Sequence, residues 1–290
     1  MNKGEDAKIL AAVLDWYHMA GVDTILGDQP TDWFEVSKKP PMRAIPDRTR
    51  STAPANRSSF QPSSQNSRPA TRQPPKQAHA DHNLAAANTS EAVLEAQALS
   101  AKATNIDELK EALAGFDGCS LKKMAKNMCF ADGNPQSSIM FVGEAPGRDE
   151  DLAGVPFVGR AGQLLNKMLQ AAQFSRQEDV WITNTVYWRP PGNRTPSQQE
   201  TEICRPFLER QIELIKPKVI VALGGAAAKH LLQTTSGIMR LRGKWHEIEV
   251  AGTKYQLLPT LHPAYLSRTP AAKRLAWRDL LAIREKINKS

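Results

Sequence analysis

Acids, an amide and an imidazole lie just after apolar stretches at three widely separated places in this 290-residue sequence. Glu144 lies in a glycine-rich, acidic segment, Asn184 closes the apolar residues 180–183, and His262 follows residues 256–261. An amide carries both a donor and an acceptor, an imidazole can donate or accept a proton, and a carboxylate can accept a proton or stabilise a cation. Together these groups could recognise a polar ligand and act on it chemically.

The surrounding elements predict that the three residues meet. Apolar runs that read as strands alternate with helical patterns: strands at 138–143, 180–186, 218–224 and 256–261, helices at 161–172, 197–215 and 226–232, a hairpin around Ala251 and Gly252, and a final helix from Pro270. This alternation predicts an α/β fold, a three-layer α/β/α domain with a mostly parallel central sheet. In such sheets ligands bind beyond the carboxyl ends of the strands, which is where all three residues stand.

The first hundred residues have a different composition. Residues 6–20 place apolar side chains on one helical face, and from about Lys38 the chain is rich in Pro, Ser, Gln and Arg. We expect a short amphipathic helix within residues 1–30, a disordered Pro/Ser/Arg-rich linker over 31–100, and the folded domain over 101–290. Its first helix should start after Asn105, with Glu108 completing a capping box, and stop near Gly118.

Charge and cysteine content narrow the class of protein. The formal net charge of +8 favours a polyanionic partner, although a solvated basic tail would give the same charge. No apolar stretch approaches the roughly 18 residues that span a bilayer, and the N-terminus lacks a secretory signal pattern, so we expect a cytoplasmic protein. The three cysteines form no CxxC pair, which predicts buried thiols.

Two nucleotide-binding motifs are excluded before any family is considered. The loop after residue 143 lacks GxGxxG spacing and carries acids where a pyrophosphate needs bare amides, and no GxxxxGK[ST] sequence is present. The segment GEAPGRDEDLAGVPFVGRAGQLL (143–165) instead resembles the first motif of the uracil-DNA glycosylases of the bacterial and archaeal family-4 branch. The later motifs follow in the same order, ITNTVYWRPPGNRTPS (182–197), RPFLERQIELIKPKVIVALG (205–224) and LHPAYLSR (261–268), so the resemblance covers about residues 105–288.

This resemblance implies a DNA repair glycosylase that hydrolyses the N-glycosidic bond of deoxyuridine, releases uracil and leaves an abasic site. Such an enzyme flips the base into a pocket, where Phe157 would stack on it. The Asn184 amide would meet O4 and N3–H of uracil, because cytosine presents the reverse pattern. His262 would donate to O2 as negative charge develops on the departing base. Gly143 and Ala145 complete the implied uracil-binding set.

The acids of the first motif would act on the sugar. A carboxylate near C1′ can stabilise a cation-like sugar and orient the attacking water. In other branches the residue that activates water, Asp or Asn, stands where this chain has Ala145. We therefore assign that catalytic role to Glu150, with Glu144 or Asp151 as alternatives.

The family also implies where DNA would be held. Two proline-stiffened loops carry arginines suited to phosphates and side chains suited to entering the vacated stack: Arg189, Arg194, Arg268, Tyr265 and Leu266. A related enzyme bonds covalently to the abasic sugar through a histidine in the loop that corresponds to Tyr187–Pro196. That loop holds no histidine here, so monofunctional hydrolysis with turnover is expected.

One family feature is incomplete. Members of this branch hold a 4Fe–4S cluster with four cysteines, and the matching positions here read Phe116, Cys119, Trp188 and Cys204. Phe and Trp cannot bind iron, so we expect no cofactor, with both rings packed where a cluster would sit. A three-cysteine site that includes Cys129 is the alternative.

Plainer interpretations remain for each residue and for the whole protein. Phe157 could be a core aromatic, Asn184 a strand end, His262 a loop residue, and the acids and arginines ordinary surface groups. The protein could be a catalytically weak DNA-binding paralogue used for recruitment, or a glycosylase for another deaminated base. We expect a monomer that acts on uracil-containing DNA, with a repair or replication protein docking on the N-terminal helix.

Overall fold

The computed structural model describes residues 78–289, with side chains described from residue 89. The expected helix within residues 1–30 and the expected linker over residues 31–77 lie outside this range. None of the helices in the described range is both long and apolar enough to cross a membrane.

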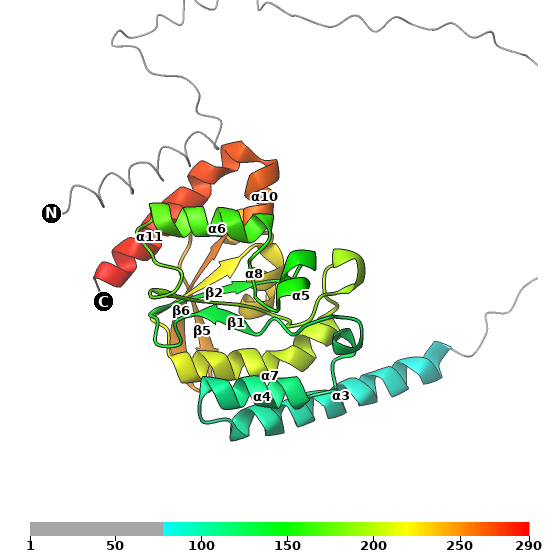
Figure 1. Cartoon of the computed structure of the whole chain (residues 1–290). Helices are drawn as coiled ribbons and strands as arrows, with labels where there is room; N and C mark the ends of the chain where they lie inside the picture. The colour runs from blue at the N-terminus through cyan, green and yellow to red at the C-terminus, as the bar shows by residue number, and fades with distance from the viewer. Residues whose placement is uncertain (1–77, 290) are drawn as a thin grey trace, which may run out of the picture. The chain divides into compact units, whose positions relative to one another are not determined.

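A single mixed sheet forms the centre of the domain (Figure 1). Within the described residues its six strands are arranged in the order β1-β3-β2-β4-β6-β5. Strands β3, β2, β4 and β6 are parallel, while β1 and β5 pair antiparallel at the two edges. The strand bounds are β1 Ala131–Gly133, β2 Ile139–Gly143, β3 Val180–Asn184, β4 Val219–Leu223, β5 His246–Val250 and β6 Thr253–Thr260. The predicted mostly parallel sheet is confirmed.

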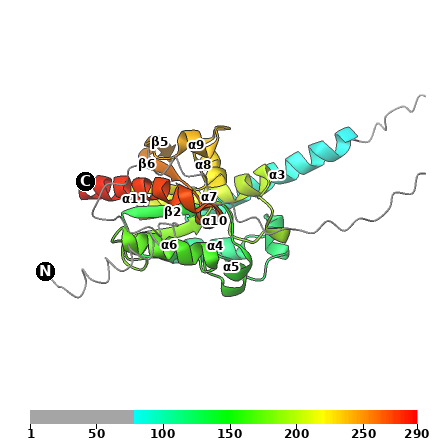
Figure 2. The same ribbon diagram turned by 90° about the horizontal axis from the view of Figure 1, so that it is seen from above.

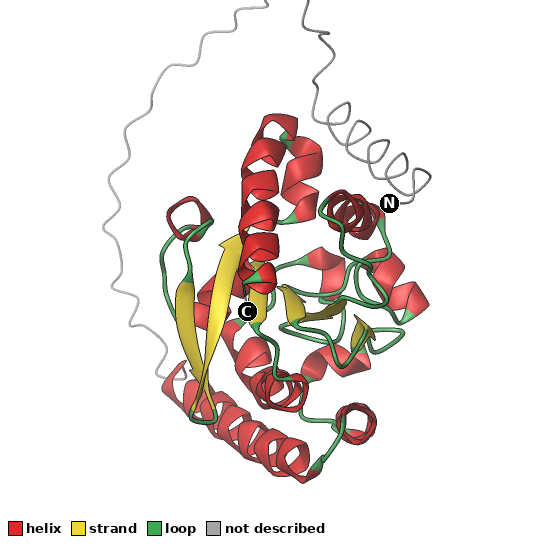
Figure 3. Cartoon of the chain, turned by 90° about the vertical axis from the view of Figure 1, so that its left-hand side faces the viewer, coloured by secondary structure: helices red, strands yellow, loops and turns green. Residues whose placement is uncertain are grey.

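Helices cover both faces of this sheet, which gives the three layers that the sequence predicts (Figures 2 and 3). One face carries α4 (Ile106–Gly115), α7 (Gln198–Ile215) and α8 (Gly225–Leu232), and the other carries α6 (Arg160–Ala171) and α11 (Lys273–Asn288). Side chains alternate between the faces along a strand. In β2, Met140 and Val142 pack toward α7, while Ile139 and Phe141 pack toward α6.

The N-terminal boundary of the domain lies earlier than the sequence predicted. The last part of the expected linker, residues 78–100, is helical and belongs to α3 (Ala78–Lys102). Ala92, Ala96 and Ser100 are buried at intervals of four residues, so they form one stripe along the helix. Composition missed this stripe because small residues add little apolar surface, although they let a helix pack closely.

Local signals gave the start of α4 more accurately than its end. The Asn105 side chain caps α4, accepting a hydrogen bond from the Glu108 amide at 2.9 Å. The Glu108 carboxylate turns back to the amide of Thr104 at 2.7 Å, one residue before the cap. Helix α4 ends at Gly115, three residues before the expected stop. Three short helices near the carboxyl ends of the strands were not predicted: α5 (Arg148–Ala153), α9 (Ile238–Leu241) and α10 (Pro263–Arg268).

Candidate active site

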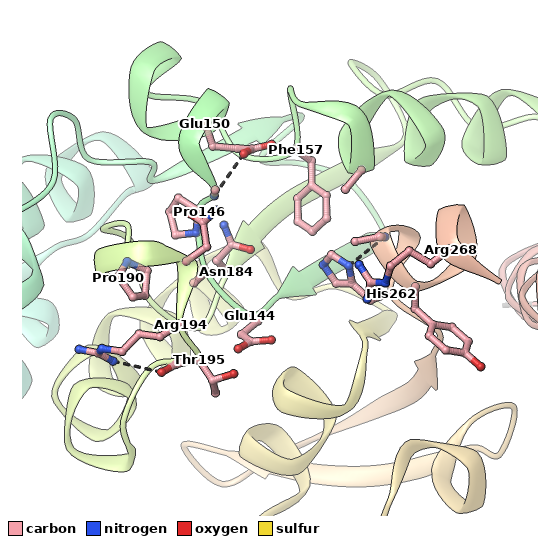
Figure 4. A pocket seen from close by; sticks show the side chains of 16 residues that line it. Glu144, Pro146, Glu150, Phe157, Asn184, Pro190, Arg194, Thr195, His262 and Arg268 are labelled. Carbon is pink, nitrogen blue, oxygen red and sulfur yellow. Dashed lines mark hydrogen bonds between the residues drawn. The ribbon is translucent and has the colours of Figure 1, made fainter. Parts of the chain in front are cut away.

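A cavity of about 500 Å³ opens at the carboxyl ends of the parallel strands. Its lining comes from the loop after β2, the end of β3, the loop before α7 and the start of α10 (Figure 4). The structure brings Glu144, Asn184 and His262 together here, with Phe157 beside them. Pro146 and Pro190 also line the cavity, and neither was among the predicted site residues.

Phe157 is both a core residue and a wall of the cavity. Its side chain is 6% exposed, and its ring centroid lies 5.7 Å from that of His262 at an angle of 36°. Its backbone is left-handed, with φ of 54°, which is uncommon for a residue with a side chain. The turn approaches α6 so closely that a Cβ at Gly162 would lie 1.8 Å from the Phe157 carbonyl oxygen. Only glycine fits at position 162.

Asn184 closes β3 with its amide turned into the cavity (Figure 4). The residue is 1% exposed, and its Oδ1 is buried without a hydrogen-bond partner in the described part of the chain. An unpaired buried acceptor destabilises a protein by about 1–3 kcal/mol, so such a group points to a ligand donor. A Cβ at Gly143 would lie 2.3 Å from this oxygen and 2.6 Å from the Phe157 ring. Glycine at 143 therefore lets the amide and the ring approach each other.

His262 occupies the N-cap position of α10, and this contact fixes its tautomer. Its Nδ1 accepts a hydrogen bond from the Ala264 amide at 3.1 Å, so a neutral ring carries its proton on Nε2. Burial, together with the charge of Arg268, lowers the pKa of His262 to about 4. At neutral pH the site therefore holds an uncharged imidazole that offers one N–H donor.

Gly224 makes room for this imidazole. A Cβ at position 224 would lie 2.9 Å from the His262 Cβ, and the backbone there has φ of 93°. Both the close approach and the backbone conformation require glycine. The backbone of the loop after β4 thus packs directly against His262, and no side chain of that loop lies between them.

The three candidate acids have different surroundings. Glu150 is 9% exposed, and its carboxylate accepts hydrogen bonds from the amides of Gly147, Val158 and Gly159 at 2.9–3.1 Å. Asp151 is 4% exposed and accepts from the amides of residues 126 and 127, and it does not line the cavity. Glu144 lines the cavity with its carboxylate directed into it (Figure 4), and that carboxylate makes no hydrogen bond to any described residue. The role assigned to Glu150 stays a prediction.

The arginines predicted to hold DNA are engaged to different degrees. Arg194 forms a bidentate pair with Glu200 at 2.6 and 2.8 Å, and Arg189 donates to Asn193 at 2.7 Å. Both contacts shape the loop before α7. Arg268 is exposed at the cavity rim.

Tyr265 and Leu266, the two residues predicted to enter the base stack, lie in α10 and point in different directions. Tyr265 is 39% exposed and lines the cavity, whereas Leu266 is fully buried in the core. The prediction that Leu266 could contact DNA is therefore wrong for this structure. The sequence was interpreted as a loop in which either residue could point outward, but neighbouring residues of a helix face different directions.

The four positions that correspond to cluster ligands are buried in a part of the core that is rich in aromatic side chains. Phe116, Cys119, Trp188 and Cys204 are at most 2% exposed, and the Phe116 ring packs 5.3 Å from that of Phe207. The two thiols contact each other, with their Sγ atoms 3.9 Å apart. A 4Fe–4S cluster needs four ligands, so these residues do not fit one.

The alternative site with three cysteines finds no support either. Among the described residues no group of three or more His, Cys, Asp or Glu side chains could hold a metal ion. The Cys129 thiol instead donates to the Glu150 carbonyl at 3.0 Å, and burial raises its pKa to about 12.

Comparison with known proteins identifies the family. Residues 130–281 match the profile of the uracil DNA glycosylase superfamily. The chain is 41% identical to the type-4 uracil-DNA glycosylase of Archaeoglobus fulgidus over 190 residues, which cover 64% of this chain and 94% of that protein. It is also 41% identical to the enzyme of the same name from Pyrobaculum aerophilum over 180 residues, covering 61% and 91%, and 41% identical to that of Thermotoga maritima over 174 residues, covering 59% and 88%. The chain therefore belongs to the uracil DNA glycosylase superfamily.

Proposed function

We propose that this protein removes uracil from DNA by hydrolysing the N-glycosidic bond of deoxyuridine, the first step of base excision repair. One observation carries the proposal: the unpaired Oδ1 of Asn184 lies in the same cavity as an aromatic ring and a neutral imidazole donor. The relatives named type-4 uracil-DNA glycosylase support the same activity.

The amide of Asn184 gives the preference for uracil. Its Oδ1 accepts from N3–H, and its Nδ2 donates to O4, while the base stacks on the Phe157 ring. Cytosine has no proton on N3 and a donor in place of O4, so both contacts become repulsive. A site built around buried hydrogen bonds rejects the wrong ligand strongly, because its polar groups would remain unpaired.

Bond cleavage uses the imidazole. As the bond between C1′ and N1 breaks, its electron pair moves onto the uracil ring, and the charge at O2 is met by the Nε2–H of His262. This donor interacts more strongly with the anion than with the neutral base, so it lowers the barrier. The imidazole stays neutral throughout and transfers no proton.

Water completes the reaction on the sugar side. The water oxygen bonds to C1′ of the cation-like sugar, and a carboxylate accepts a proton from the water. The contacts favour Glu144 for this task over Glu150, because the Glu144 carboxylate lines the cavity without a hydrogen bond to any described residue, while that of Glu150 accepts from three amides. Glu150 then acts by holding the loop that carries Phe157.

The rim of the cavity would hold the DNA. Arg268 and half-exposed Arg194 line the cavity and suit the phosphates that flank the flipped nucleotide, and Arg189, in the same loop as Arg194, would add a further contact. Tyr265 suits the space left in the base stack.

Two of the four cluster positions are occupied by apolar rings, so the protein works without a 4Fe–4S cluster; purified protein would then show neither bound iron nor visible absorption from one.

The protein acts as a monomer on the DNA of the bacterial nucleoid, in the cytoplasm, and residues 1–30 dock a repair or replication protein. Deleting residues 1–77 should leave activity on short oligonucleotides within about twofold, since Phe157, Asn184 and His262 all belong to the folded domain.

The activity is tested directly with a single-stranded oligonucleotide that contains one uracil. The protein is incubated with it, and abasic sites are then cleaved with alkali. We expect strand scission that is lost in Asn184→Ala and His262→Ala but kept in the matched controls Asn288→Ala and His246→Gln, which lie outside the cavity.

Two results would favour the other functions. Tight binding of the oligonucleotide without scission would indicate a DNA-binding paralogue. Faster release of hypoxanthine or xanthine than of uracil in a mixed-lesion assay would indicate a different base specificity.

A further inference from the structure

The turn that carries Phe157 is held from two sides by opposite charges. On one side the Glu150 carboxylate accepts from the amides of Val158 and Gly159 at 3.0 and 2.9 Å. On the other side Arg176 donates to the carbonyl of Pro156 at 2.7 Å and to that of Phe157 at 3.1 Å. The carboxylate thus binds the amides of the turn, and the guanidinium binds its carbonyls.

Arg176 is itself fixed by two further contacts. Its Nε donates to Asp132 in β1 at 2.6 Å, and its Nη1 also donates to Asn166 in α6 at 2.8 Å. The side chain is 14% exposed, so solvent competes little with these bonds. A planar guanidinium with this many partners has one orientation, which a lysine ammonium could not reproduce.

Phe157 needs such support because of its backbone. With φ of 54° it adopts a conformation that disfavours any residue with a Cβ. Its ring must also stay close to Gly143 and Asn184, where a single added methyl group would overlap it. If the turn relaxed to an ordinary φ, the ring would leave the position from which it can stack on a base.

We propose that Arg176 is a positioning residue for recognition of the flipped base, and that it acts only through Phe157. This inference rests on the proposed function. Arg176 does not line the cavity, so it touches neither the substrate nor the reacting atoms. Its contact with Asp132 also gives the short edge strand β1 a function, since that strand anchors the guanidinium.

The test compares two arginines that reach the same loop, in the full chain. Arg284 donates to Gln173 at 2.8 Å, in the loop that carries Arg176, but among the described residues it makes no hydrogen bond to the Phe157 turn, and it lies outside the cavity. We expect Arg176→Gln to raise KM for the uracil oligonucleotide and the inhibition constant of free uracil about tenfold, with a smaller fall in kcat. Arg284→Gln should leave all three within about twofold.

A double-mutant cycle decides whether Arg176 acts through Phe157. In a Phe157→Ala background, Arg176→Gln should cause no further change in KM, because the ring that it positions is gone. Effects on KM that multiply in the double variant would overturn the inference. If Arg176→Gln folds poorly, Asp132→Asn replaces it, with a smaller change in the same direction, and an unchanged KM in that variant would equally count against the inference.

Hydrogen exchange separates this inference from the proposed function. Arg176→Gln should speed amide exchange at residues 157–159, and Arg284→Gln should not. Equal exchange in the two variants would overturn the positioning role even if uracil is released. A wild-type protein that releases no uracil would refute the proposed function. The exchange measurement would still test whether Arg176 holds the turn that carries Phe157.

Discussion

At the scale of single residues, the charge state of His262 decides how the site can work. The ring accepts a hydrogen bond from the Ala264 amide on Nδ1, its burial disfavours a charge, and the nearby Arg268 further disfavours a second positive charge. An imidazole with a pKa of about 4 is neutral throughout the physiological range. In the proposed reaction it would therefore stabilise the departing anion as a hydrogen-bond donor and not as a cation.

This charge state predicts the pH dependence. The folded pKa of His262 is lowered below its ordinary value of 6.5, so the unfolded chain binds the proton more readily between pH 6.5 and 4. This residue should therefore reduce stability as the pH falls through that window, while kcat should show no inflection near pH 6.5 that depends on it. Nitrogen NMR of the labelled ring gives the result directly: a proton on Nε2 alone at pH 6 agrees, and a doubly protonated ring does not.

Asn184 offers a second test at this scale. Asn184→Asp keeps an acceptor for N3–H but loses the donor to O4. We expect kcat/KM for uracil to fall at least about a hundredfold, because a buried carboxylate would face the O4 acceptor. Thermal unfolding serves as the control, since the variant should melt as a folded protein. An unchanged kcat/KM would remove the amide from base recognition.

Gly143 shows that an absent side chain can be part of a site. Gly143→Ala would place a methyl group 2.3 Å from Asn184 Oδ1 and 2.6 Å from the Phe157 ring, so both must shift. We expect activity to fall about a hundredfold or more, since small misplacements of binding groups have large effects on rate. Gly115→Ala, where the added methyl meets nothing within 4 Å, is the matched control and should keep full activity.

At the scale of elements, the loop between β2 and α6 separates two acids that the sequence could not tell apart. Glu144→Gln should lower activity with little effect on stability, because its carboxylate has no partner among the described residues. Glu150→Gln should reduce the free energy of unfolding by about 1–3 kcal/mol, because a neutral amide cannot accept all three backbone N–H groups. Denaturant unfolding and the uracil assay on both variants check this. A loss of stability in Glu144→Gln together with a loss of activity in Glu150→Gln would indicate that Glu150 activates the water.

The elements also show how far sequence patterns reach. Hydrophobic alternation located the four parallel strands within a few residues and placed Glu144, Asn184 and His262 at one edge of the sheet. It could not reveal α10, which is six residues long and begins at a proline. Without that helix, the inward direction of Leu266 and the capping contact of His262 were both hidden. Arg176 was missed for a different reason: its partners lie 10 to 44 residues away in the chain, beyond any local pattern.

At the scale of the whole molecule, the region that corresponds to the cluster site is filled with side chains. Phe116 belongs to the large core that joins α4, α7 and the sheet, and it is fully buried. The Phe116 ring packs against Phe207 of α7, so aromatic packing ties the residues before β1 to the domain.

The stability of the whole domain should then depend on this packing. We expect Phe116→Ala to reduce the free energy of unfolding by about 3–5 kcal/mol, the usual range for a buried phenylalanine. Met124→Ala, at a side chain that is 66% exposed, should change it by less than about 0.5 kcal/mol. Chemical denaturation measures both, and an equal effect of the two substitutions would show that the ring contributes no packing energy.

We propose that one cavity holds uracil by an amide, an aromatic ring and a neutral imidazole. A crystal structure of the protein with free uracil tests it most directly. We predict the base stacked on Phe157, with N3 within hydrogen-bond distance of Asn184 Oδ1 and O2 within reach of His262 Nε2. Uracil bound away from these three side chains, or lying in the cavity with its N3 edge turned from Asn184, would contradict the account.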